Sequence, residues 1–149
     1  MATGCGDDED RSNWIEIPFS EFSSEEIDGT GISGMNLNWQ GLGYNNSVII
    51  VNSREEMEKY IVGNIGDYPE IDFSKHSLLL ASGTACCCLD NVNVNNLWQI
   101  SKNQFILDVE VRTFLSLVAS YWHIALVTSK LNSSSNIRLN VNHLEIRDI

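Results

Sequence analysis

Long hydrophobic runs and basic clusters are both missing from this chain of 149 residues. Its longest apolar runs, such as residues 48–51, have about four residues, whereas a helix that crosses a bilayer needs about 20. We therefore expect no membrane-spanning helix. Lysine and arginine together number 9 against 20 aspartates and glutamates, for a formal charge of −11. A chain with so few basic residues would release few counterions from the phosphates of a nucleic acid and would gain little binding free energy. We therefore expect no nucleic-acid partner.

Common catalytic patterns are missing as well. The chain has neither a Gly-x-Ser-x-Gly nucleophile motif nor a glycine-rich phosphate-binding loop. His76, His123 and His143 do not stand at a metal-ligand spacing. Asp108 and Glu110 alternate along a predicted strand and share its outward face, which is more typical of a solvated surface than of a glycosidase pair. We predict no catalytic residues, no metal site and no cofactor.

The amino terminus resembles a processed bacterial lipoprotein. Residues 2–5 read Ala-Thr-Gly-Cys, like the end of a lipobox, in which the cysteine receives the lipid. We interpret Met1 as an added start that replaces a trimmed signal peptide. Four acidic residues follow, as in the surface-export signal of Bacteroidetes lipoproteins: Asp7, Asp8, Glu9 and Asp10. We predict an acidic leader over residues 1–13 with lipidation at Cys5; the alternative is an acidic leader without targeting value.

Residues 14–149 are predicted to form a single domain in which strand patterns dominate. Ser53 followed by Glu56 has the form of a helical capping box, which predicts a helix over about residues 54–62. Strands are predicted at residues 47–51, 78–83, 91–100, 104–112, 122–128 and 137–142. The predicted fold class is α+β: one antiparallel or mixed sheet with one main helix packed on a face.

Three segments resemble a known family: residues 48–57 (VIIVNSREEM), 71–80 (IDFSKHSLLL) and 122–131 (WHIALVTSKL). They are similar to small Bacteroidetes lipoproteins, which are distantly similar to the PrcB-like accessory lipoproteins of a surface protease complex. The resemblance covers about residues 47–142 and implies a fold and an envelope location. Where that family carries a Thr-Gly-Gly-Tyr-like loop, residues 83–88 here read Gly-Thr-Ala-Cys-Cys-Cys, so no loop function is carried over.

Two other features are candidate sites. Cys86, Cys87 and Cys88 are consecutive, and neighbours on a strand point to opposite faces, so they need a turn to meet at one metal. They are interpreted as a bridge to a partner, a soft-metal site with His76 or His123, a redox thiol, or half-buried reduced residues. Trp39 lies in a glycine-rich segment and is interpreted as part of a binding surface or as a loop anchor on the sheet.

These patterns predict a non-enzymatic envelope lipoprotein that binds a protein partner or acts as an accessory subunit of an envelope complex. Its expected location is the outer membrane, at the cell surface or facing the periplasm, with the lipid as its only membrane attachment. A small thiol- or metal-dependent enzyme centred on Cys86–Cys88 is one alternative. A carbohydrate-binding surface lipoprotein is another.

Overall fold

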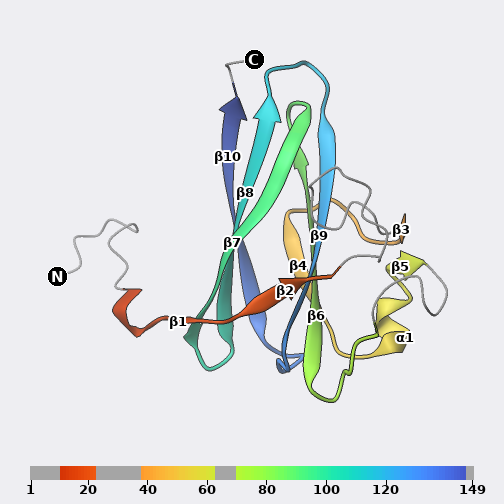
Figure 1. Ribbon diagram of the computed structural model, residues 1–149, viewed down its shortest axis with the longest axis vertical. Coiled ribbons are helices and arrows are strands. Elements are labelled where there is room, and N and C mark those ends of the chain that lie inside the picture. Colours follow the sequence, from red (N-terminus) through yellow and green to blue (C-terminus); the bar gives the residue numbers. More distant parts are fainter. Residues whose placement is uncertain (1–10, 23–37, 63–69, 147–149) are drawn as a thin grey trace.

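The protein is a sandwich of two four-stranded sheets, seen in a computed structural model that describes residues 11–22, 38–62 and 70–146 (Figure 1). The A sheet has the strand order β1-β7-β8-β10, and the B sheet has the order β2-β9-β6-β4. Strands β3 and β5 form a separate two-stranded sheet. The strands are β1 (Ile15–Glu16), β2 (Phe19–Glu21), β3 (Asn38–Trp39), β4 (Ser47–Val51), β5 (Ile61–Val62), β6 (His76–Ala85), β7 (Leu89–Ser101), β8 (Gln104–Phe114), β9 (Ser120–Ser129) and β10 (Asn136–Ile146).

The chain passes repeatedly between the two sheets. It leaves the B sheet after β6, forms the antiparallel β7–β8 pair in the A sheet, and returns to the B sheet as β9. Strand β10 then joins the A sheet parallel to β8, because the intervening β9 lies in the other sheet. At the amino-terminal end, β1 pairs with β7 and β2 with β9, so residues 15–21 run from one sheet to the other.

The main core fills the space between the sheets. Alternate residues of β8 point inward, and four of them, Phe105, Leu107, Val109 and Val111, are almost completely buried. They meet Leu79, Trp122, Ile124 and Leu126 of the B sheet. This alternation is the period of two that a strand with one buried face requires.

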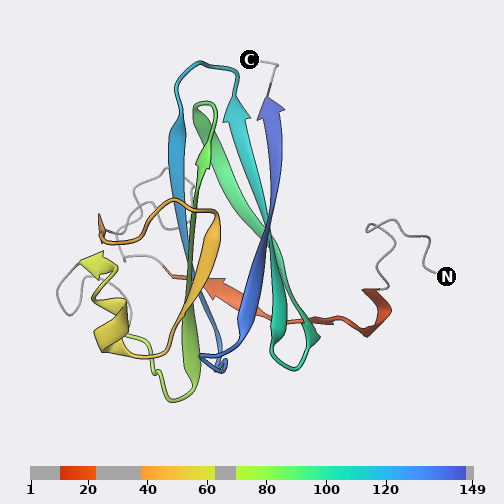
Figure 2. The same cartoon turned by 180° about the vertical axis from the view of Figure 1, so that it is seen from behind.

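A second core lies on the outer face of the B sheet. Leu78, Leu80 and Ala125 point away from the main core and are fully buried. Met57 and Ile61 pack over them together with partly buried side chains that include Trp39, Leu42, Ile71 and Phe73. Figure 1 shows α1, β3 and β5 on this side of the molecule, and Figure 2 shows the same arrangement from behind. Both faces of β6 are therefore covered.

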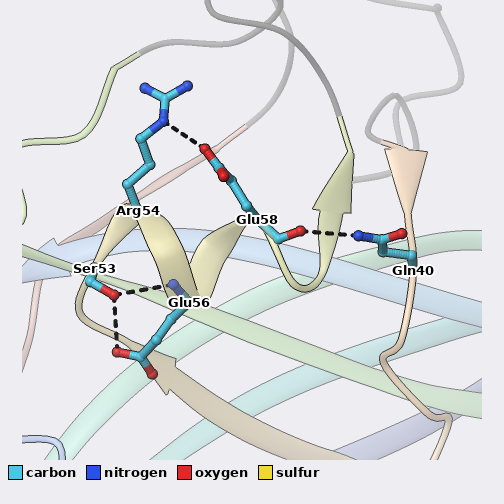
Figure 3. A network of polar contacts seen from close by, with 5 residues as sticks. All are labelled: Gln40, Ser53, Arg54, Glu56 and Glu58. Atoms are coloured by element: carbon cyan, nitrogen blue, oxygen red, sulfur yellow. Dashed lines mark hydrogen bonds and ion pairs between the residues drawn. The ribbon is translucent and has the colours of Figure 1, made fainter.

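The predicted Ser53 cap is confirmed, but the predicted helix is too long. Helix α1 covers only Arg54–Met57. The Ser53 hydroxyl accepts a hydrogen bond from the Glu56 backbone N–H at 3.1 Å, and Arg54 pairs with Glu58 at 2.9 Å (Figure 3). Gln40 Nε2 donates to the Glu58 carbonyl at 3.0 Å, which ties the end of this turn to the segment after β3. The chain then enters β5, whose pairing with β3 ends the helix.

The predicted fold class is wrong. Strands make up most of the described residues, and no described helix reaches seven residues, so the molecule is a mostly-β sandwich and not an α+β domain with a main helix. The physical reason lies in β6, whose run Leu78–Ala81 is apolar on both faces. One short helix covers only part of one face, and the opposite face needs the second sheet.

Candidate functional site: an amide-rich sheet face

The outer face of the A sheet carries a cluster of polar side chains that we call the amide face: Asn93, Asn96, Asp108, Glu110, Asn140 and Asn142. Strand pairing places them in two rows across three strands. Asn96, Asp108 and Asn140 stand side by side, and Asn93, Glu110 and Asn142 form the next row. The α-helix α1 lies on the far side of the B sheet, away from this face (Figure 1).

Asp108 organises the first row. Its carboxylate accepts a hydrogen bond from Asn140 Nδ2 at 2.8 Å and one from Trp98 Nε1 at 3.1 Å. Asn96 Nδ2 donates to the Glu16 carboxylate of β1 at 2.5 Å. These bonds hold the side chains of three strands and the neighbouring edge strand in one arrangement. Both Asp108 oxygens accept a hydrogen bond, so this carboxylate positions its neighbours.

A β-bulge aligns the amides. Asn93 and Asn96 are three residues apart, so in a regular strand they would point to opposite faces. The register of β7 shifts between Val94 and Asn96, and the extra residue Asn95 lets both side chains face outward. Leu97 consequently points into the main core, while Trp98 returns to the outer face.

A shallow polar hollow of about 160 Å³ lies beside this bulge. Its lining includes the side chains of Asn95, Asn96, Asp108, Asn140 and Asn142. Asn95 and Asn142 are exposed and make no side-chain hydrogen bond within the described residues. Their amides can therefore donate to a ligand and accept from it without breaking internal contacts.

An aromatic pair borders one end of the amide face. Trp98 lies beside Trp14, with ring centroids 6.1 Å apart and the planes tilted by 58°. Ile106, opposite Trp98 on β8, is only 3% exposed although it lies on the outer face. At the other end, Arg112 stands opposite Asn91, and the Arg112 Nε and Asn91 Oδ1 atoms are buried without a hydrogen-bond partner. The face thus runs from an apolar end to a polar end.

Trp39 lies far from this surface in the fold, on the outer side of the B sheet. Its ring stacks on His123, with centroids 4.6 Å apart and planes within 15°. Tyr44 contacts both His123 and Tyr121, at centroid distances of 5.0 and 4.4 Å. Trp39 is half-buried and packs against the second core. This packing supports the loop-anchor interpretation, and a role for Trp39 in binding stays a prediction.

The surroundings of His123 disfavour its charged form. Its side chain is largely buried, and its Nε2 atom has no hydrogen-bond partner. Burial lowers the pKa of His123 because the charged ring would lose hydration. The structure therefore assigns this histidine to packing in the aromatic cluster.

The three consecutive cysteines lie in the connection between β6 and β7. Cys87 is buried, Cys86 and Cys88 are exposed, and the Sγ atoms of Cys86 and Cys87 are 3.1 Å apart. His76 begins β6, at the end opposite the cysteines, so it does not join them. No group of three or more metal-binding side chains occurs among the described residues. The turn brings two sulfurs together, and His76, one of the two histidines considered as partners in a soft-metal site, lies away from them.

Sequence reasoning missed the amide face. The sequence shows the asparagines of β7 and β10 but not that they share one face. That arrangement depends on the bulge at Asn95 and on the parallel pairing of β10 with β8, which are tertiary features. The predicted lipidation site Cys5 and the acidic residues Asp7, Asp8, Glu9 and Asp10 lie outside the described residues.

Comparisons with known proteins add no relative: no family model, no curated protein and no solved structure matches the chain. The likeness to Bacteroidetes lipoproteins thus stays a prediction. None of the described helices is long and apolar enough to cross a membrane.

Proposed function

We propose that the chain is a non-enzymatic binding domain of an envelope lipoprotein and that its amide face binds a carbohydrate. The observation that carries this proposal is the hydrogen-bonded row of amides and carboxylates across β7, β8 and β10, bordered by Trp98. Sugar hydroxyls both donate and accept hydrogen bonds, and each asparagine amide offers one acceptor oxygen and two donor hydrogens. The chemistry of the face matches that of a polar, uncharged ligand.

The rigidity of the site supports the same conclusion. The amides stand on paired strands, and Asp108 and Glu16 fix those of Asn140 and Asn96, so binding orders few further side chains. The bordering Trp98 offers an apolar surface of the kind that packs against the C–H groups of a sugar ring. Protein interfaces, by contrast, concentrate aromatic and other apolar side chains at their centre, which the amide face does not. The carboxylates of Glu16, Asp108 and Glu110 oppose a phosphate-bearing ligand.

Calorimetry on oligosaccharides selected from a glycan array tests the proposal. We expect Asn142→Ala and Asn95→Ala each to weaken binding by about 1 kcal/mol, because each removes hydrogen bonds to the ligand. Asn45→Ala is the matched control, since Asn45 is exposed and lies outside the amide face. The proposal fails if no oligosaccharide binds, or if the control variant loses as much affinity as the two test variants.

Docking of an envelope protein is a second candidate, favoured by the apolar loop, residues 115–118 between β8 and β9 at the top of Figure 1. Leu115, Leu117 and Val118 are 67%, 103% and 63% exposed. Exposed apolar side chains gathered in one loop are typical of contact sites. Chemical cross-linking on intact cells should join the wild-type chain to one defined protein, and Leu117→Ser should abolish that product. An unchanged product in the variant would remove the apolar loop as its docking site.

We further propose that Cys5 anchors the domain to the outer membrane through lipid, as the order of small residues, cysteine and acidic residues indicates. In a suitable bacterium the full-length protein should partition into detergent, and Cys5→Ala should abolish this. Neutralising Asp7, Asp8, Glu9 and Asp10 should reduce accessibility to external protease while leaving the anchor in place. Unchanged partitioning of Cys5→Ala would defeat the anchor, and unchanged protease sensitivity would defeat only the export signal.

A further inference from the structure

Cys86 and Cys87 are adjacent in sequence, yet their side chains meet. Neighbours in a regular strand point to opposite faces. Strand β6 ends at Ala85, however, and the chain turns before β7 begins at Leu89. Within this turn the two Sγ atoms lie 3.1 Å apart. A disulfide bond is about 2.05 Å long, so the sulfurs need to approach by about 1 Å to be joined.

The third cysteine is held differently. The Cys88 backbone N–H donates to Ser116 Oγ at 2.9 Å, and its carbonyl accepts from the Phe114 N–H at 2.8 Å. These bonds fix the Cys88 backbone against the start of the loop between β8 and β9, while its thiol is exposed. The turn therefore separates the three cysteines into one close pair and one single thiol.

We propose that Cys86 and Cys87 form a reversible redox pair that closes to a vicinal disulfide by exchange with a low-molecular-weight disulfide. The exposed Cys86 thiolate attacks one sulfur of that disulfide, which releases the first small thiolate and leaves a mixed disulfide on Cys86. The Cys87 thiolate then attacks the Cys86 sulfur and releases the second. Two cysteine thiols are oxidised, the small disulfide is reduced to two thiols, and the two protons lost by the cysteines go to these thiols.

Exposure and geometry account for the order of the steps and for reversibility. Cys86 is open to solvent and Cys87 is 6% exposed, so the incoming disulfide meets Cys86 first. The Cα atoms of neighbouring residues are about 3.8 Å apart, less than the roughly 4.4 to 6.8 Å that most disulfides span. A bond at this place is consequently strained and easily reduced, as regulatory disulfides are. The neighbouring Cys87 sulfur raises the pKa of Cys86, so closure should be faster in alkaline buffer.

The test equilibrates the purified full chain with glutathione buffers of graded redox ratio, alkylates the remaining thiols and maps the peptides by mass spectrometry. We expect the Cys86 and Cys87 thiols to be lost in one transition, with no glutathione retained on either of them, whereas the exposed Cys88 thiol can carry glutathione. Cys88→Ser is the matched control and should keep this transition. Cys87→Ser should instead accumulate glutathione on Cys86, the intermediate that the wild type resolves.

Four results would overturn the proposal. Two concern the products of the wild type: glutathione adducts alone, or mainly disulfide-linked dimers. The third is loss of the transition in Cys88→Ser. The fourth is closure of the pair at the same redox ratio in the folded and the denatured chain. The last comparison is decisive for the geometry, because the folded turn fixes the two sulfurs near each other, whereas the side chains of these neighbours rotate in the denatured chain. Closure of the folded chain at a more reducing ratio than the denatured chain would support the proposal.

Discussion

The two sheets can be compared at the faces that they turn away from each other. The outer face of the B sheet buries Leu78, Leu80 and Ala125 under α1 and the segments around Trp39. The outer face of the A sheet instead presents the amide face, where Asn140 is hydrogen-bonded to Asp108 and Asn96 to Glu16. Each sheet contributes its other face to the same main core.

This contrast separates the parts of the molecule that stabilise the fold from the part that we propose binds a ligand. Burial of apolar area drives folding, and the B sheet gains it on both faces. The outer face of the A sheet buries little apolar area at the amide face. Apolar burial therefore does not explain its ordered row of amides and carboxylates. An ordered polar surface on a rigid sheet is what a binding site for a polar ligand requires.

The largest expected effect is on strand register. Deleting Val109 from the regular part of β8 turns every residue on one side of the deletion to the opposite face, so polar side chains enter the main core. We expect no cooperative unfolding transition for this variant in circular dichroism. Deleting Asn95 removes only the bulge and preserves the alternation of Asn93, Val94 and Asn96. That variant should unfold cooperatively, and failure of both deletions to fold would contradict the assigned role of the bulge.

Truncations on the two outer faces should differ by several kilocalories per mole. Leu80→Ala leaves a cavity in the second core and should lower the free energy of unfolding by about 2 to 5 kcal/mol. Asn142→Ala, on the exposed amide face, should change it by no more than about 0.5 kcal/mol. Urea denaturation of both variants measures the difference, and equal losses would show that the amide face also supports the fold.

Replacing Trp39 should have an intermediate effect. The ring is half-buried and stacks on His123, so Trp39→Ala should cost about 1 to 3 kcal/mol, less than truncation of a fully buried tryptophan. Binding of an oligosaccharide to the amide face should persist in this variant at temperatures where it remains folded. If affinity disappears while the free energy of unfolding is unchanged, Trp39 belongs to the binding surface and not to the packing of the B sheet.

The smallest expected effect is the pH dependence contributed by His123. Its pKa is lowered in the folded state from the ordinary 6.5, so the unfolded chain takes up the proton first as the pH falls. Stability from this residue is intact above about pH 6.5 and declines progressively below it. His123→Phe keeps a ring beside Trp39 but removes the titrating group. Between about pH 7 and pH 5, the free energy of unfolding of this variant should therefore fall less than that of the wild type. Parallel curves for both proteins would contradict the assignment of a buried neutral histidine.

Local features of this fold could be predicted from the sequence, whereas the partners of each strand could not. The Ser53 cap depends on residues within one turn and was predicted correctly. The helix beyond Met57 was overestimated because pairing of β5 with β3 is a tertiary interaction that helical spacing does not reveal. The run Leu78–Ala81 is apolar throughout, but its sequence does not reveal that the A sheet covers one face of β6 and that α1 covers only part of the other. The amide face depends on the bulge at Asn95 and on strands distant in sequence, so no local pattern predicts it.

The most direct test of the account is a nuclear magnetic resonance titration of the side-chain amides with the oligosaccharide that binds best. We expect the NH₂ signals of Asn95, Asn96, Asn140 and Asn142 to shift together and to saturate at one affinity. The signals of Asn45 and Asn52, which lie on the B-sheet side, should stay in place. Saturable shifts confined to Asn45 and the rings around Trp39, with the amide-face signals unchanged, would contradict it and move the binding site to the outer face of the B sheet.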